Sequence, residues 1–400
     1  MNKILFIFLF LIFPICSIEK RVLFLDKTTR DNLDQAVNAE WTIVGGGPAG
    51  ITVIGLLLDA GVDPSSIIWI DPEFNVGRIG KYYSTVPANS LTKNFIAYIN
   101  ACKEFSTYQS EAIQHLKECD PEKECVLDLI VRPLQDITNI LRNKILSLED
   151  HVEQLNFNNN IWNIHTHNCC FKSNHVVLAT GCRPRTLNYI KDKEIQLDVA
   201  LTKEELAKQI EKNDTIAVVG DKHSAMLILK FLSELPIARI MNFYRSKPIY
   251  WTDPGAENSG LSGIAAEWAK EVYEQNPPHN LLKIFSCDET LTLWTALCTK
   301  IIYAVGYERN PLPSINGQTT ISYDDTTGIV MPRLFGIGIA FPEQYIASNG
   351  NIEHKVGLRE FSEYAQKVIP LWMQQKKDSV RHLLPFDRLF NISYVCLQRK

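Results

Sequence analysis

The sequence predicts an α/β fold in which two units of strands and helices are combined with a β-meander. An apolar strand, a glycine-bearing loop and a helix follow one another in residues 41–61, and the same order returns from residue 215. Between them, residues 151–180 contain short apolar runs separated by turns, which is typical of a meander rather than a crossover helix. Strands that alternate with helices form parallel sheets, so we expect two Rossmann-like units.

Composition and charge limit the classes of function. The chain has 400 residues, of which 46% are hydrophobic and 22% charged, enough for two or three domains with large cores. The net charge of -4 gives no general basic field of the kind that attracts nucleic acid. We therefore expect no nucleic-acid partner.

The first 17 residues differ in character from the rest of the chain. Lys3 precedes an apolar run over residues 4–15, and the small residues Cys16 and Ser17 follow it. This layout is typical of a secretory signal, and the run is shorter than the roughly 20 residues of a membrane span. The sequence predicts a signal peptide or an anchor in residues 1–17, and with it an exported or membrane-anchored protein.

The cysteines and histidines indicate no metal site. The ten cysteines include no C-x-x-C pair, and no histidine or carboxylate set has the spacing of zinc ligands. Most of the cysteines are expected to be buried thiols. A disulfide between Cys119 and Cys125 is an alternative in an exported protein.

The first glycine loop carries the strongest signal. Gly45 permits a tight turn, Gly47 lets the backbone approach a pyrophosphate, and Gly50 lets helix and strand pack closely. The helix that follows would offer free N–H groups and a positive dipole end to phosphates. A second short strand ends in Asp71, a carboxylate that can accept both hydroxyls of an adenosine ribose. The pattern predicts a dinucleotide site.

The second loop, "VVGDKHSA", departs from the usual pattern. Gly220 begins it as expected, but Lys222 replaces the middle glycine, and Ser224 follows. A side chain limits close approach to a pyrophosphate, although a lysine ammonium could supply charge to phosphates. The loop thus predicts either a functional or a weakened NAD(P) site. Arg245 and Lys247, beyond the next strand, would favour a 2′-phosphate; alternatively they are ordinary solvated residues.

Three later segments complete a recognisable order. They are Ala179-Thr180-Gly181, Ala304-Val305-Gly306, and "PRLFGIGIAFPE" at residues 332–343. With the two loops, this order resembles the two-dinucleotide-binding-domain flavoproteins over about residues 41–372. It is most similar to the flavin-containing monooxygenase and amine N-hydroxylase branch. The disulfide reductases carry a flavin-facing cysteine pair and an aspartate after the late glycine, whereas this chain lacks such a pair and has Ile339 after Gly338.

The resemblance implies two cofactors. FAD would contact Gly45, Gly47, Pro48, Ala49, Gly50, Asp71, Thr180, Gly181, Gly306 and Gly338. NADP, or alternatively NAD, would contact Gly220, Lys222, Ser224 and Arg245. In the segment "YYSTVPANSLTKNF", Asn89 would reach the reactive edge of the flavin; alternatively it caps or precedes a helix over residues 91–105.

The implied architecture is a discontinuous FAD-binding domain, residues 41–200 and 293–375, with a NAD(P)-binding domain inserted at 201–292 and a tail at 376–400. The implied reaction passes hydride from NAD(P)H to flavin N5 and then activates O2 toward a soft nucleophile on a small molecule. Two alternatives are a flavin reductase or oxidase that oxygenates nothing, and an FAD-binding scaffold with a decayed NAD(P) site.

Overall fold

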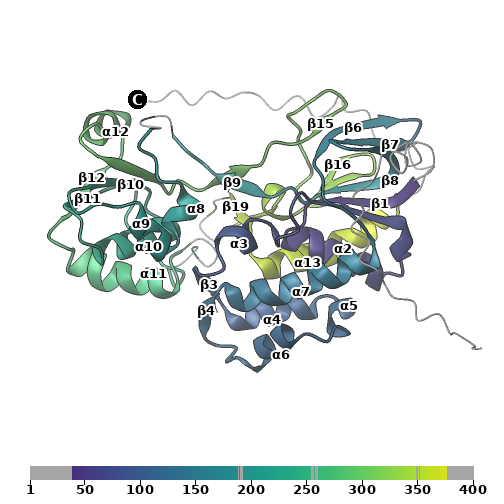
Figure 1. Ribbon diagram of the computed structural model, residues 1–400, viewed down its shortest axis with the longest axis horizontal. Helices are drawn as coiled ribbons and strands as arrows, with labels where there is room; N and C mark the ends of the chain where they lie inside the picture. The colour runs from purple at the N-terminus through teal and green to yellow at the C-terminus, as the bar shows by residue number, and fades with distance from the viewer. Residues whose placement is uncertain are drawn as a thin grey trace, which may run out of the picture.

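The computed structural model describes residues 38–187, 189, 192–253, 256, 260–347, 350 and 352–375. A mixed sheet and a parallel sheet lie side by side, and the strand β9 (Cys182–Pro184) runs between them (Figure 1). We call the part around the larger sheet the first unit and the part around the four-stranded sheet the second unit. The predicted signal or anchor and the predicted tail lie outside the described residues.

The first unit is centred on five parallel strands. Their order is β5-β2-β1-β8-β17, and β16 pairs with β17 in the antiparallel sense. β1 and β2 are buried along nearly their whole length, as expected for strands covered on both faces. The bounds are β1 (Asn38–Val44), β2 (Ile67–Ile70), β5 (Leu146–Leu148), β8 (Cys170–Leu178), β16 (Ile329–Met331) and β17 (Leu334–Gly336).

The predicted β-meander is present and shares a strand with this sheet. The strands β6 (Val152–Asn158) and β7 (Ile161–Thr166) pair in the antiparallel sense, and β7 pairs with the start of β8. The end of β8 instead pairs with β17, while β15 (Ser314–Ile315) lies along β6. β8 therefore carries the chain from the meander to the edge of the sheet where the first glycine loop lies.

The second unit repeats the strand order of the first. Its parallel order, β12-β11-β10-β13, corresponds to β5-β2-β1-β8. This confirms the predicted α/β fold with two Rossmann-like units. The fourth strand, β13, lies beyond residue 292, where the sequence predicted the insert to end. The bounds are β10 (Thr215–Val219), β11 (Arg239–Tyr244), β12 (Leu281–Phe285) and β13 (Lys300–Tyr303).

Helices cover the first sheet on the side shown below it in Figure 1. The predicted helix over residues 91–105 is divided into two helices, one of which ends at Asn100 while the other begins at Lys103, and residue 91 belongs to strand β3. The helices are α2 (Pro48–Asp59), α3 (Gly77–Tyr82), α4 (Thr92–Asn100), α5 (Lys103–Ser106), α6 (Glu111–Glu118), α7 (Asp128–Lys144) and α13 (Leu358–Met373). The short strands β3 (Pro87–Leu91) and β4 (Glu124–Val126) form an antiparallel ribbon beside them.

The second unit has its own helices and core. The helix α10 (His223–Ser233) packs on α11 (Gly263–Trp268), which continues as η2 (Ala269–Gln275), and both bury apolar residues against β10 and β11. The remaining helices are α8 (Leu197–Ala200), α9 (Lys203–Lys208) and α12 (Asp288–Thr295).

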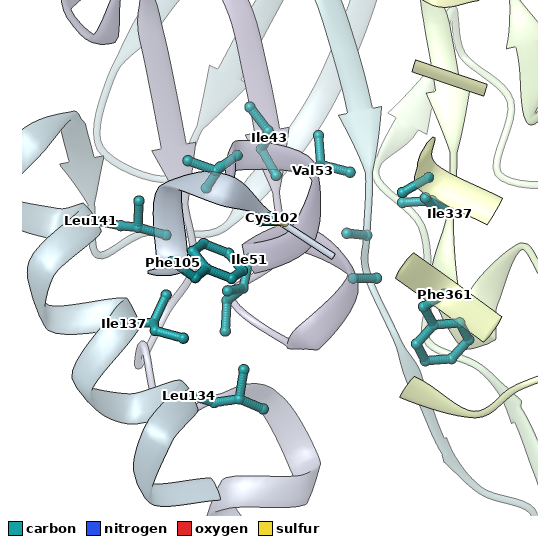
Figure 2. Close-up of a cluster of buried hydrophobic side chains, with 14 of the residues drawn as sticks. Ile43, Ile51, Val53, Cys102, Phe105, Leu134, Ile137, Leu141, Ile337 and Phe361 are labelled. Carbon is teal, nitrogen blue, oxygen red and sulfur yellow. The ribbon is translucent and has the colours of Figure 1, made fainter. Parts of the chain in front are cut away.

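The core of the first unit surrounds α2 (Figure 2). Ile51 and Val53 of α2 are fully buried, and Phe105 and Leu134 reach the same cluster from α5 and α7. A Cβ on Gly55 would lie 2.6 Å from the Phe105 ring, so the glycine lets that ring pack against α2. Each buried side chain of this size contributes roughly 1.5–3 kcal/mol to folding. The start of α2 is therefore held firmly against the strands.

Four stacked rings fix the late segment. Phe335 stacks on Trp372 with 4.6 Å between ring centroids and lies 6.1 Å from Trp41, which itself stacks on His175 at 4.3 Å. The rings come from β17, α13, β1 and β8. Stacking of this kind adds about 0.5–1.5 kcal/mol for each pair beyond burial of area. It sets the path of the chain toward Gly338.

The predicted localisation was wrong. Within the described ranges, no helix is long and apolar enough to cross a membrane. The apolar run that suggested export or anchoring lies outside those ranges, and a run of its length is shorter than a span requires. Cys119 and Cys125, which the same reasoning allowed as a disulfide, are free thiols.

Replacing Gly45 with alanine tests the contact on which the first glycine loop rests. The new Cβ would lie 2.2 Å from the Ala179 carbonyl oxygen, at a φ of 120°. Strain and overpacking together should lower the free energy of unfolding by about 3 kcal/mol or more. In the control Gly61→Ala, φ is 83° and nothing lies within 4 Å, so only the strain of about 1 kcal/mol is expected. Urea unfolding measures both, and equal losses would contradict the steric argument.

Candidate functional site

A cavity of about 1050 Å³ opens at the carboxyl ends of the first sheet. Its floor is made of the turns that follow β1, β2, β5 and β8, which meet at one edge because these strands are parallel. β3 and the start of α13 form side walls, and Trp251 and Ser262 of the second unit close another side. Ligands of open α/β sheets bind at this edge.

The first glycine loop lies in the floor of the cavity. Gly45, Gly47 and Pro48 line it, and Gly47 has no neighbour nearer than 3.9 Å in the direction of a Cβ. Gly50 instead lies behind the loop, where a Cβ would approach the Gly45 carbonyl oxygen to 2.1 Å. Ala49 is buried beside it. The loop therefore exposes backbone and the start of α2 to the cavity, as the glycine spacing predicts.

Asp71 connects the loop to the end of β2. Its Oδ2 accepts a hydrogen bond from the Gly46 N–H at 2.6 Å, and its Oδ1 accepts from the Glu73 and Phe74 N–H groups at 2.9 and 2.7 Å. The carboxylate lines the cavity. These three backbone donors fix its position beside the loop, and no cationic partner of Asp71 is found in the described part of the chain.

The turn after β5 also lines the cavity, and the sequence analysis missed it. Asp150 is 8% exposed and accepts hydrogen bonds from Thr166 Oγ1 at 2.7 Å and from the Asn168 N–H at 3.1 Å. These bonds hold His151 and Val152 at the cavity wall. The only available signal was the rule that parallel strands end at the same edge, and β5, with three residues, was too short to recognise.

Asn89 lies in β3 and lines the cavity. The residue that precedes α4 as its N-cap is Leu91, so Asn89 does not cap that helix. Its carbonyl oxygen accepts a hydrogen bond from Ser262 Oγ of the second unit at 3.0 Å. The candidate residue thus lies where the two units meet.

A second contact between the units lies on the neighbouring strand. The Glu124 carboxylate of β4 lies against the backbone at the start of α11. Burial, helped by the nearby charge of Glu267, raises the pKa of Glu124. A Cβ on Gly263 would lie 2.0 Å from this carboxylate, so only glycine allows the approach.

Thr180 and Gly181, which were predicted to contact FAD, line the cavity just beyond the end of β8. Asn310 donates a hydrogen bond to the Thr180 carbonyl at 2.8 Å, but Thr180 Oγ1 is buried and has no hydrogen-bond partner in the described residues. A buried hydroxyl without a partner at a cavity wall indicates a place for a polar ligand group. Gly306 lies outside the cavity lining, at the equivalent strand end of the second unit.

A polar cluster joins the units at the cavity rim. The Asp198 carboxylate of α8 accepts hydrogen bonds from Arg78 Nη1 and from the Tyr83 hydroxyl. Arg78 Nε donates to the Cys182 carbonyl at 3.1 Å, and the Tyr307 hydroxyl donates to Tyr83 at 3.1 Å. Burial raises the pKa of Tyr307 to about 12, and burial likewise raises the pKa of Tyr83. Both tyrosines therefore stay protonated and act as donors.

Gly338 supports the cavity from behind. It has a φ of 79°, and its Cβ position is 2.6 Å from the Ala49 side chain, so the late segment packs directly on the first turn of α2. The residue that lines the cavity is its neighbour Ile339. Gly338 itself, the residue predicted to contact FAD, does not line the cavity.

The second loop has the backbone of the first but lies away from the cavity. A Cβ on Gly220 would lie 2.3 Å from the Ala304 carbonyl oxygen, which matches Gly45 over Ala179. Lys222 is the exposed N-cap of α10, and Ser224 is partly buried in the first turn. Arg245 is exposed beyond β11. Gly220, Lys222 and Ser224 of the loop and Arg245 beyond β11 therefore lie at the same edge of the second sheet.

These features fit FAD. The cavity has the volume for a large cofactor, the starts of both α2 and α13 line it, and glycines remove side chains where a diphosphate would approach. Asp71 offers a fixed carboxylate and Thr180 a hydroxyl without a partner. Within the described residues, no group of three or more histidines, cysteines or carboxylates is suited to a metal ion.

The fold and this cavity define a flavoprotein with two dinucleotide-binding units. No protein-family model matches the chain. A curated relative, the monooxygenase AgnR1 of Paecilomyces divaricatus, is 30% identical over 382 aligned positions, gaps included, and the match covers 83% of this chain and 97% of the relative. The chain belongs to the family of this monooxygenase, and it is a monooxygenase-like, FAD-dependent oxidoreductase.

Solved structures agree on the fold. The L-lysine 6-monooxygenase of Pseudomonas syringae has a TM-score of 0.58 at 12% identity, with 84% of this chain and 99% of that chain covered. The cadaverine monooxygenase DfoA of Erwinia amylovora gives 0.58 at 12% identity over 86% and 96%. The bacillithiol disulfide reductase of Staphylococcus aureus gives 0.55 at 12% identity over 85% and 100%. The fold is thus common to both branches.

His223, at the start of α10, should make stability depend on pH. Burial lowers its pKa to about 4, and its Nδ1 has no partner among the described residues. The unfolded chain therefore binds more protons between about pH 6.5 and 4, so stability present above pH 6.5 is lost as the pH falls through this window.

Urea unfolding at pH 7 and pH 5 measures this contribution. Between these two pH values, the free energy of unfolding of His223→Gln should fall by about 2 kcal/mol less than that of the unmodified protein. His167→Gln, whose side chain is 72% exposed, should keep the full dependence. An unchanged slope in His223→Gln would show that the imidazole is not buried in its neutral form.

Proposed function

We propose that this protein is an NADPH-linked, FAD-dependent monooxygenase that oxygenates a soft nucleophile, such as an amine or a sulfur, on a small molecule. The observation that carries the proposal is the large cavity whose floor contains the first glycine loop and Asp71, in a chain related to a monooxygenase. The named activities of the lysine and cadaverine enzymes support an amine among the candidate nucleophiles.

The first unit would bind FAD. Gly45, Gly47 and Pro48 would receive the diphosphate at the start of α2, and Asp71 would bind the adenosine ribose. The turn at residues 150–152 would lie near the adenine, since β5 follows β2 in the sheet. When bound, FAD would supply hydride acceptance and O2 activation, while the protein orients the cofactor and excludes water.

Asn89 would face the reactive edge of the flavin. It lines the cavity on the side closed by Trp251 and Ser262, which belong to the unit that would deliver the nicotinamide. Its carboxamide offers both a donor and an acceptor, so it can orient a polar substrate group or a nicotinamide amide. Its backbone is held by the contact with Ser262.

The second unit would bind NADPH through Gly220, Lys222, Ser224 and Arg245. The glycine contact with Ala304 gives the loop the shape of the first loop, and Lys222 is exposed at the start of α10, where its ammonium can reach a phosphate. The FAD-binding part would comprise residues 41–200 and the later portion of residues 293–375. The inserted NADPH-binding part would extend past residue 292 to include β13, which completes its sheet.

Anaerobic titration with NADPH tests the proposal. The purified protein should be yellow, and NADPH should bleach the flavin absorbance. Admission of O2 with a nucleophilic substrate should then give an oxygenated product. Stoichiometric peroxide without such a product would indicate the reductase or oxidase alternative, and a yellow protein that NADPH does not bleach would indicate a scaffold. A folded protein that is colourless and does not bind FAD would overturn the assignment altogether.

Asp71→Ala should weaken FAD binding by at least about tenfold, because a charged acceptor of ribose hydroxyls is lost. The matched control is Asp63→Ala, an exposed carboxylate that accepts a hydrogen bond from the Ser65 N–H far from the cavity lining. Fluorescence titration of the FAD-free proteins gives the affinities. Equal FAD affinity in the two variants would remove Asp71 from the cofactor site.

A further inference from the structure

The two units can be superimposed residue by residue through their strand registers. Val44 pairs with Ile70 in the first unit and Val219 with Phe243 in the second. In both, the first glycine donates its N–H to the carbonyl of that strand partner, at 2.8 and 2.9 Å. Asp221 therefore corresponds to Gly46, and Tyr244 to Asp71.

In the two units, the carboxylate that holds the turn after the second strand comes from different segments. In the first unit, Asp71 at the strand end accepts hydrogen bonds from Gly46 in the loop and from the Glu73 N–H in the following turn. In the second unit, Asp221 in the loop accepts from the N–H groups of the turn after the strand. That turn is thus held by a carboxylate in both units, supplied by the strand end in the first unit and by the glycine loop in the second.

Asp221 is well placed to hold its turn. It is 6% exposed, and its Oδ2 accepts from the Arg245 N–H at 2.8 Å, the Ser246 N–H at 2.7 Å and Ser246 Oγ at 3.1 Å. Three donors to one buried oxygen fix the backbone of residues 245–246.

The exchange changes what the turn can bind. The strand end that carries a ribose-binding aspartate in the first unit carries Tyr244 in the second, so no carboxylate is offered to a ribose 2′-hydroxyl there. Arg245 and Lys247 are exposed on the fixed turn, and neither has an ion-pair partner among the described residues. Two free cations on a rigid turn suit a phosphate better than a hydroxyl.

We propose that Asp221 is the positioning residue that makes the second unit select a 2′-phosphorylated nicotinamide dinucleotide, by holding residues 245–246 so that Arg245 meets the 2′-phosphate. This inference rests on the proposed NADPH-binding function of that unit. Asp221 does not contact the ligand; it determines where the cation that does so is held.

The test compares two probes that differ by the 2′-phosphate, adenosine 2′,5′-bisphosphate and 5′-AMP, by isothermal titration of the FAD-loaded protein. Asp221→Gly introduces the residue that the first loop has at the equivalent position, and Asp221→Ala removes the carboxylate without adding backbone freedom. Both variants should raise the dissociation constant of the bisphosphate by about tenfold or more, and that of 5′-AMP by less than about twofold. Asp221→Asn keeps an acceptor oxygen and should stay within about threefold of the unmodified protein.

Stopped-flow reduction of the flavin provides a second readout. In Asp221→Gly, the NADPH concentration for half-maximal reduction should rise about tenfold. The limiting reduction rate and the NADH dependence should change little. If both probes lose affinity equally in the variants, Asp221 has only a structural role and the inference is overturned. It is overturned as well if the variants still distinguish the two probes as the unmodified protein does. If the unmodified protein binds both probes equally, the proposed preference for NADPH is wrong. If the unmodified protein prefers the bisphosphate and only the expected effect of the Asp221 variants is missing, the proposed function stands and the role of Asp221 is wrong.

Discussion

The architecture depends on one close contact, in which a glycine that ends a strand lies over the carbonyl that ends the neighbouring strand. Gly45 over Ala179 and Gly220 over Ala304 leave no room for a Cβ, at 2.2 and 2.3 Å. Because the chain can turn this tightly, each helix begins directly at the edge of its sheet. In the first unit this places the start of α2 in the cavity floor.

Both loops are supported from below at the same position of the second strand. The carbonyl of Gly45 accepts a hydrogen bond from the Trp69 indole at 2.9 Å, and that of Gly220 from the Asn242 amide at 2.8 Å. The register makes Trp69 and Asn242 equivalent. A buried carbonyl at a tight turn requires such a partner. The backbone geometry is thus common to both units, while the side chains that maintain it differ, and with them the surface offered to a ligand.

Local patterns were sufficient for the fold but not for the whole site. Glycine spacing, apolar runs and turn residues act over a few neighbours, so the two Rossmann-like units and the meander could be read from the sequence. Asp150, Trp251 and Ser262 reach the cavity only through tertiary arrangement, and no local pattern marks them. The assignment of residue 91 to β3 rather than to the predicted helix has the same origin, because β3 forms by pairing with the distant strand β4. The proposed role of Asp221 can be recognised only when the strand registers of the two units are compared.

The β3–β4 ribbon belongs to both units, and this determines what controls the site. Val86 and Leu127, at its base, pack into the core of the second unit, and Leu127 also packs against the core of the first. The polar contact from Ser262 reaches the same ribbon at Asn89. Apolar packing at the base of the ribbon and the polar contact at Asn89 therefore both connect the two units. Since Asn89 lies on this shared ribbon, its position relative to the first glycine loop depends on how both units pack. The part of the proposed site that would face the flavin edge therefore requires both units.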